Sequence, residues 1–354
     1  MPGTAPAGPP RRWSSAAIEA GSADRAAFPP SPGGSYTRGK RVFGRHIMAG
    51  PNDDGVCRDS GDATTAPGDF PTLPVVVSLL AALQPDTPDS FDQVLALARC
   101  EPCLAIDLLQ QAGRHDPPES GYLDSLETAL SRIGVAGIRA LIDRPTNVVF
   151  SPGTDAQKLL WLHSLQVATA SELLAERTPG GGVSPQTARL AGLVHDLGRF
   201  VSYRDDPLAP DRVDAFGYQT PDALQAAERY SSTPDHAALG EQVGAQLGLP
   251  PLLLQVIGGH HGASPPAPGT RAARLIELVR IADTISLHCM QGDRSQLNQV
   301  AAIVERVTAV PMLEHYPALL QDLPSIAERT VELAFADFER LRIGRTRYHD
   351  LCDA

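Results

Sequence analysis

The chain has 354 residues, of which 42% are hydrophobic, so it is long enough to bury a sizeable core. Its net charge of −11 and its 5% aromatic residues argue against nucleic acid as a partner, because phosphate contacts need clustered Lys and Arg and base stacking needs aromatic rings. The longest apolar runs, such as residues 72–83, are too short to cross a bilayer, and no apolar signal segment follows Met1. Together with an odd number of cysteines, five, these features predict a cytoplasmic protein without a membrane partner.

Residues 1–69 are rich in Pro, Gly, Ser and Ala and show neither helical nor strand periodicity. Such a segment buries too little apolar surface to offset the entropy of ordering, so we predict a disordered tail. Its first 50 residues carry seven Lys or Arg against two acids, which leaves a weak contact with nucleic acid as the last of our hypotheses. Translation could start at Met1 or at Met48.

Residues 70–152 show a helical pattern, with apolar residues three and four positions apart in FDQVLALARC, CLAIDLLQQAG and LDSLETALSRIGVAGIRALID. Pro102, Gly113 and Gly134 punctuate these helices. Cys100 and Cys103 form a Cys-x-x-Cys pair. Because the sequence has no second cysteine pair for a zinc site and no βαβ pattern for redox chemistry, we interpret them as two partly buried thiols.

Residues 153–290 are also predicted to be helical. We expect a helix over residues 156–176, a helix-like run AGLVHDLGRF over 191–200, a Pro- and Asp-rich loop over 205–214, and a helix over 223–230. His236 opens a further helix behind Thr233-Pro234-Asp235. Beyond residue 290, two amphipathic segments are predicted to be helices that pack on this second half.

Two carboxylates in these helices need partners. Asp196 lies in the apolar run at 191–200, and the helix around Asp283 is apolar nearly all round, so an unpartnered charge would be costly at either place. Any single histidine would more often be an ordinary hydrogen-bonded residue, but the chain offers a whole set in a fixed order. The candidate partners are the histidines His163, His195, His236, His260 and His261.

The order His, His-Asp, His, His-His, Asp resembles the HD superfamily of metal-dependent phosphohydrolases. The words WLHS, GLVHDLGR, DHAALG, GGHH and IAD resemble its HDOD branch, the HD-related output domain. The first half adds Glu101-Pro102-Cys103-Leu104, similar to the Asp-Pro-x-Leu helix start of that branch, and an Ala-Leu-x-x-Ile-Gly helix at 129–134. The resemblance implies an all-α fold of two packed helical subdomains, residues 70–152 and 153–290, followed by C-terminal helices over 291–354.

The resemblance also implies a metal centre. One ion would be held by His163, His195, Asp196 and Asp283, and Asp196 would bridge to a second ion held by His236, His260 and His261. Imidazole and carboxylate ligands suit first-row divalent ions, of which iron or manganese are our first choices. Asp196 and Arg199 are the candidate catalytic residues, and Arg199 and Arg280 could supply positive charge to a phosphate.

Three functions remain open on the sequence. The first is a regulatory protein of the HDOD type, which acts through contacts with other signalling proteins and uses its metal site for structure or sensing. The second is an active binuclear phosphodiesterase or phosphohydrolase with a nucleotide-like substrate. The related HD-GYP phosphodiesterases carry a Gly-Tyr-Pro signature and a Lys after their His-Asp. This chain lacks the signature and has Arg199 at the Lys position, which argues against hydrolysis of cyclic di-GMP.

Overall fold

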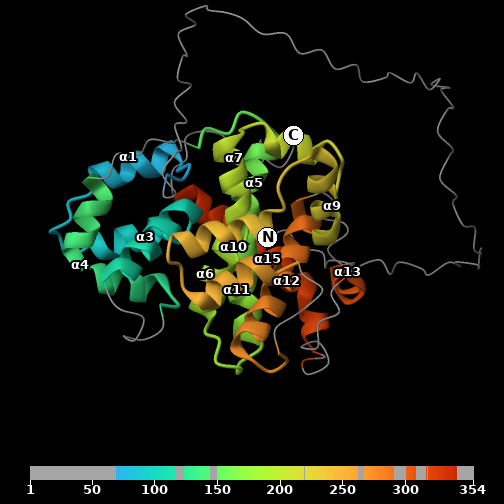
Figure 1. Ribbon diagram of the computed structural model, residues 1–354. Coiled ribbons are helices and arrows are strands. Elements are labelled where there is room, and N and C mark those ends of the chain that lie inside the picture. Colours follow the sequence, from blue (N-terminus) through green and yellow to red (C-terminus); the bar gives the residue numbers. More distant parts are fainter. Residues whose placement is uncertain are drawn as a thin grey trace, which may run out of the picture. The chain divides into compact units, whose positions relative to one another are not determined.

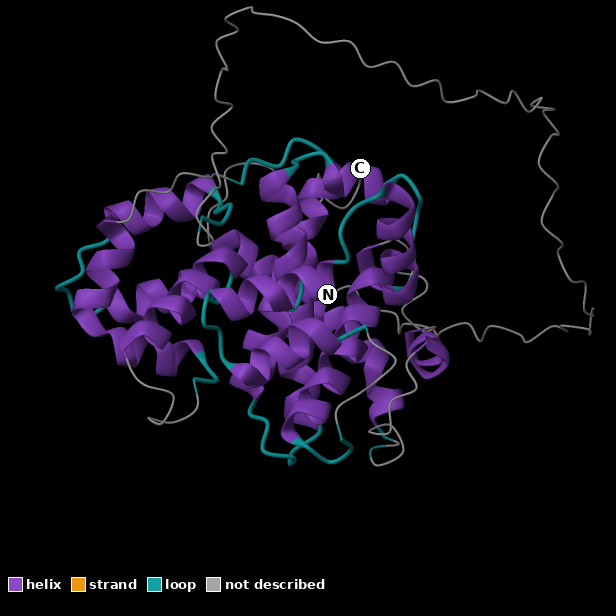
Figure 2. Cartoon of the chain, in the orientation of Figure 1, coloured by secondary structure: helices purple, strands orange, loops and turns teal. Residues whose placement is uncertain are grey.

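The computed structural model describes residues 69–115, 123–143, 150–218, 220–261, 267–290, 300–307, 316 and 318–340. Every regular element in these ranges is a helix, as the periodicity predicted, and Figure 2 shows no strand among them. None of the described helices is long and apolar enough to cross a membrane. The predicted tail lies outside the described residues, except for Asp69.

The first four helices lie together in Figure 1, in blue to green. They are α1 (Pro74–Ala82), α2 (Ser90–Ala98), α3 (Pro102–His115) and α4 (Leu126–Asp143). Two of the three predicted breaks are confirmed, because α3 begins at Pro102 and α4 is kinked at Gly134, whose φ of 58° is a left-handed value that favours glycine, whereas Gly113 lies within α3. Cys100 lies just before α3 and Cys103 in its first turn, and both are buried rather than partly buried, with no disulfide between them.

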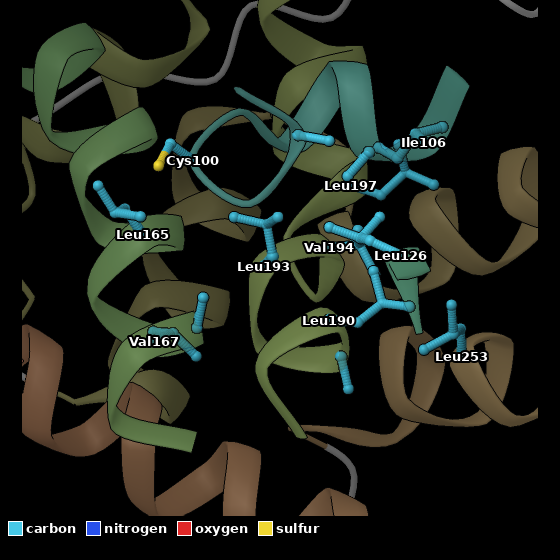
Figure 3. Packing of buried hydrophobic residues seen from close by; sticks show 14 of the residues in the cluster. Cys100, Ile106, Leu126, Leu165, Val167, Leu190, Leu193, Val194, Leu197 and Leu253 are labelled. Atoms are coloured by element: carbon cyan, nitrogen blue, oxygen red, sulfur yellow. The ribbon is translucent and has the colours of Figure 1, made fainter. Parts of the chain in front are cut away.

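The remaining helices are built around α5 (Asp155–Arg177), which packs against the next helix in sequence and against α12 and α15. Apolar side chains from several other helices, among them Ile106, Leu165 and Leu253, lie around Leu190, Leu193 and Val194 (Figure 3). The other helices are α6 (Pro185–Val194), α7 (Leu197–Asp205), α8 (Ala209–Asp214), α9 (Pro221–Ser231), α10 (His236–Gln246), α11 (Pro251–Gly259), α12 (Arg271–Met290), α13 (Val300–Val307) and α15 (Leu319–Arg340).

Two expectations need correction. The run 191–200 is not one helix, because α6 ends at Val194 and α7 begins at Leu197, with His195 and Asp196 in the turn between them. Asp196 has φ −92° and ψ 24°, values outside the helical region, and the turn frees its side chain from the helix face. The segment 205–214, expected to be a loop, contains the short helix α8, which begins at Ala209 with Pro210 in its first turn.

A buried ion-pair network joins the two halves and the C-terminal helix. Arg189 on α6 is 5% exposed and donates to Glu172 on α5 and to Asp337 on α15, at 2.9 Å each. Arg99, after α2, binds the same Glu172 at 2.9 Å and Glu127 on α4 at 3.3 Å. Arg189 is shielded from water, whereas the side chains of Arg99 and Glu127 are 29% and 38% exposed, so removal of a partner of Arg189 should destabilise the helix packing most.

Candidate metal centre

The structure brings all seven predicted ligands into one buried cluster. His163 lies on α5, His195 and Asp196 lie in the α6–α7 turn, and Asp283 lies on α12. The remaining three flank other helices, with His236 as the first residue of α10 and His260 and His261 directly after α11. His261 is 8% exposed, and the other six are 1% exposed or less.

Three glycines let these elements approach closely enough to form the cluster. A Cβ at Gly192 on α6 would lie 2.7 Å from the backbone oxygen of Val167 on α5, so only glycine allows this helix contact. A Cβ at Gly198 on α7 would overlap the carbonyl oxygen of His236 and lie 2.8 Å from the amide nitrogen of Gly240. The crossing of α7 and α10 therefore places the first residue of α10 beside the α6–α7 turn.

The ligand atoms form two groups, and within each group one atom of every residue lies within 4.8 Å of the others. The first group is His163, His195 and Asp283, and the second is Asp196, His236, His260 and His261. Asp196 lies between them, since its Oδ2 is 3.5 Å from His163 Nε2 while its Oδ1 is 3.2 Å from His236 Nε2. The resemblance assigned the same residues to two ions with Asp196 shared between them, and that assignment stays a prediction.

Hydrogen bonds outside the cluster set the tautomers of four histidines. Nδ1–H of His195 donates to Gly192 O at 2.7 Å, and Nδ1–H of His260 donates to Ile257 O at 2.8 Å. In the same way, His236 donates from Nδ1 to a carboxylate, that of Glu228, at 2.8 Å. Each neutral ring therefore presents an unprotonated Nε2 to the centre of the cluster.

His163 is oriented through a relay. The hydroxyl of Ser286 donates to Gln166 Oε1 at 2.8 Å, so its oxygen accepts from Nδ1–H of His163 at 2.9 Å. The Nε2 atom of His163 is then left as a lone-pair donor, 3.3 Å from Asp283 Oδ1. Such an outer hydrogen bond is the usual way in which proteins orient a metal-binding imidazole.

The charges inside the cluster favour ionised acids and mostly neutral imidazoles. Burial, the largest influence, lowers the pKa of His195 to about 4 and that of His261 well below its usual range. Burial alone would raise the pKa of Asp196, but His195, Arg199 and His236 together outweigh it and hold that pKa well below its usual range. Burial alone would lower the pKa of His236, but Asp196 and Glu228 outweigh it and raise that pKa, so a divalent cation would compete with a proton at this ring.

Several buried nitrogen and oxygen atoms of the cluster lack a hydrogen-bond partner, as expected of residues that hold a metal ion. His163 Nε2, His195 Nε2, Asp196 Oδ1 and both carboxylate oxygens of Asp283 are buried and have no hydrogen-bond partner. Nε2 of His236 also lies 3.2 Å from His260 Nε2 and 3.0 Å from His261 Nε2, so three ring nitrogens face one another. Buried acceptors without a donor are costly, and a cation at their centre would satisfy them together.

The two arginines considered for phosphate binding are occupied within the protein. Arg199 is buried and donates to Asp196 Oδ2 at 3.0 Å and to the hydroxyl of Tyr218 at 3.2 Å. Arg280 donates to the backbone oxygens of Gly259 and His260, at 2.9 and 2.8 Å, and so caps the end of α11. Both therefore hold residues of the His/Asp cluster or the backbone beside them in place.

Sequence reasoning missed Glu228, Tyr218, Gln166 and Ser286, all of which hold a ligand or its partner. Glu228 is 2% exposed and, besides its bond to the His236 ring, accepts from the backbone N–H of His236 at 3.3 Å. The one available signal was an acid in the otherwise apolar and small-residue stretch ALQAAE of α9. The other three are common polar residues whose role depends on the packing of distant helices.

The fold and the cluster define an all-helical protein with a buried His/Asp centre of the kind typical of HD folds. The family model of the HDOD domain matches residues 70–263, more than half of the chain, and the chain therefore belongs to the HDOD family. No protein of curated function matches the sequence at a significant level.

Solved structures show the same fold. The response regulator MmoQ from Methylococcus capsulatus str. Bath is 18% identical with a TM-score of 0.52, over 71% of this chain and 97% of that one. A fragment of MmoQ matches with a TM-score of 0.50 at 17% identity, over 74% of this chain and 91% of the fragment.

Proposed function

We propose that the chain is an HDOD signalling regulator whose buried cluster binds divalent metal ions and whose output is contact with other signalling proteins. The main support for a metal site is that Nε2 and carboxylate oxygen atoms without hydrogen-bond partners come together in a centre shielded from water. The candidate ligands are His163, His195, Asp196, His236, His260, His261 and Asp283, and the candidate ions are iron or manganese, one in each group.

Two features favour regulation over turnover. The seven candidate ligands are at most 8% exposed, which leaves little room for a phosphodiester to reach the ions. The guanidinium groups of Arg199 and Arg280 are bound to Asp196, Tyr218 and backbone oxygens, so neither offers a free positive charge to a phosphate. A metal held in this way would link the helices on both sides of the cluster, so its binding and loss would change how these helices pack.

The alternative is a binuclear phosphohydrolase with a nucleotide-like substrate, and the position of Asp196 between the two ligand groups favours it. A bound pair of divalent ions would supply positive charge and an activated water for phosphodiester hydrolysis. In that case Asp196 would hold the ions together and Arg199 would hold Asp196 in place through its 3.0 Å contact.

Assays of the metal-loaded protein separate the two functions. We expect no metal-dependent release of phosphate or nucleotide from a panel of phosphodiesters and nucleotides. We also expect a signalling protein to bind the metal-loaded wild type and not Asp196→Ala. Metal-dependent turnover that is lost in Asp196→Ala would replace the regulatory function with the hydrolytic one.

A further inference from the structure

The segment that follows α7 has a small apolar cluster of its own. We call residues 206–235 the α8–α9 segment, all of which the structure describes except residue 219. Its apolar contacts form a small cluster of Val213, Leu224 and Ala227 with Tyr218 against them, distinct from the main core. A segment with so little apolar burial of its own is held in place largely by its polar contacts with the body.

Two of those polar contacts connect the segment to candidate metal ligands, one through Arg199 and one directly. Tyr218 accepts from Arg199, which in turn binds Asp196 Oδ2 at 3.0 Å. At the other end of the segment, Glu228 on α9 holds His236 by its ring Nδ1–H at 2.8 Å and by its backbone N–H at 3.3 Å. The segment thus contacts His236 directly and Asp196 through Arg199. These two residues lie at the middle of the cluster, with His236 Nε2 3.2 Å from Asp196 Oδ1.

The remaining contacts do not involve the cluster. Gln157 on α5 donates to Pro207 O at 2.9 Å and to Asp211 Oδ2 at 3.1 Å, which holds the start of the segment. On the outer side, the rings of Phe216 and Tyr230 stack with centroids 6.0 Å apart and are 53% and 76% exposed. The position of α9 and of this aromatic pair therefore depends on whether Asp196 and His236 are fixed.

We infer that Glu228 and Tyr218 are positioning residues of the metal centre, and that through them the α8–α9 segment follows the occupation of the centre. This inference rests on the proposed metal site. With a divalent ion present, Nε2 of His236 is engaged and its Nδ1–H is aimed at Glu228. Without the ion, Nε2 of His236 faces only Asp196 Oδ1 at 3.2 Å and the Nε2 atoms of His260 and His261 at 3.2 and 3.0 Å, so it can exchange between these partners and its orientation is less firmly fixed.

Hydrogen exchange measured by mass spectrometry, with Mn²⁺ as the added ion, tests the inference on the full chain. In the wild type, Mn²⁺ should slow exchange in α9 as well as in α5. At a free concentration one hundred times the dissociation constant, amides that open only with loss of the ion should exchange up to about 100-fold more slowly. Metal binding is measured on the same samples by titration calorimetry.

The variants are Tyr218→Phe and Glu228→Gln, alone and together, each measured at the same multiple of its own dissociation constant. We expect Mn²⁺ to protect α5 in all of them and to lose its effect on α9 in the double variant. Tyr230→Phe and Glu241→Gln make the same chemical changes at exposed positions and should behave as wild type.

Three results would overturn the inference. If Mn²⁺ binds the wild type but leaves exchange in α9 unchanged, the coupling is wrong while the metal centre stands. The same conclusion follows if the double variant shows the wild-type response in α9. If the wild type does not bind Mn²⁺, the proposed metal site and the coupling both fail.

Discussion

Alanine at position 198 should disrupt the approach of α7 and α10 and, with it, the metal centre. The added Cβ would overlap the carbonyl oxygen of His236 and lie 2.8 Å from the amide nitrogen of Gly240, and both of these are backbone atoms that cannot swing aside. Overpacking typically costs about 1–3 kcal/mol, and a backbone clash lies at the upper end of that range. Removing a helical glycine recovers at most ~1 kcal/mol, so we expect a net loss of about 2 kcal/mol.

The matched control is Gly258→Ala on α11. There the three nearest atoms to the added Cβ all belong to the exposed side chain of Glu241, whose carboxylate can move away and whose own Cβ is 3.3 Å distant, so stability should stay within about 1 kcal/mol of the wild type. Urea unfolding followed by circular dichroism gives the two free energies, and elemental analysis gives the metal content. Since α10 begins with His236, Gly198→Ala should also lose metal. A Gly198→Ala protein as stable and as metal-rich as Gly258→Ala would refute this account of the helix crossing.

Three further predictions follow from other buried charges. Asp196→Ala should lose metal and destabilise the fold by about 3–5 kcal/mol in urea unfolding, because it leaves the buried Arg199 without its carboxylate partner; unchanged metal content would contradict the assignment. Burial raises the pKa of Glu101 from 4.5 to about 8, so its contribution is fully present below pH 4.5 and is lost as pH rises through 8. Relative to Glu101→Gln, the wild type should lose up to ~5 kcal/mol between these pH values, at about 1.36 kcal/mol per pKa unit, and a pH-independent difference would be against it. Arg189→Met should expose α15 to limited proteolysis because it breaks the bond to Asp337, whereas Arg177→Met, at a half-exposed pair, should not.

The local sequence pattern predicted where the helices lie and which of their residues are buried. It did not predict where one helix ends and the next begins. The apolar spacing around Asp283 predicted a helix buried on all sides, and Leu275, Val279 and Ile285 are fully buried there. The same spacing concealed the break at His195 and Asp196, because apolar residues continue on both sides of the turn and no glycine or proline marks it. Hydrophobic periodicity reports which face is buried and carries no information on where the backbone turns within a buried run.

The sequence predicted which residues form the candidate site. It did not predict the residues that position them. The order of histidines and acids identified seven side chains that the fold brings together, although their binding of metal remains a prediction. Glu228 precedes His236 by only eight residues, yet its role depends on how α9 packs beside the start of α10, which no local pattern encodes. The role of Gly198 and Gly240 in the crossing of α7 and α10 was not predictable either, because the sequence does not distinguish a glycine at a helix crossing from any other glycine.

The central claim is that the buried cluster holds divalent metal, and metal content per chain tests it most directly. The protein would be purified without added metal and without a histidine tag, and its iron, manganese, zinc and nickel measured by elemental analysis. We predict about two equivalents per chain, one for each ligand group on either side of Asp196. A stable, folded protein that contains no metal and takes up none on dialysis against Mn²⁺ or Fe²⁺ would contradict the account, and would leave the seven residues as a hydrogen-bonded polar core.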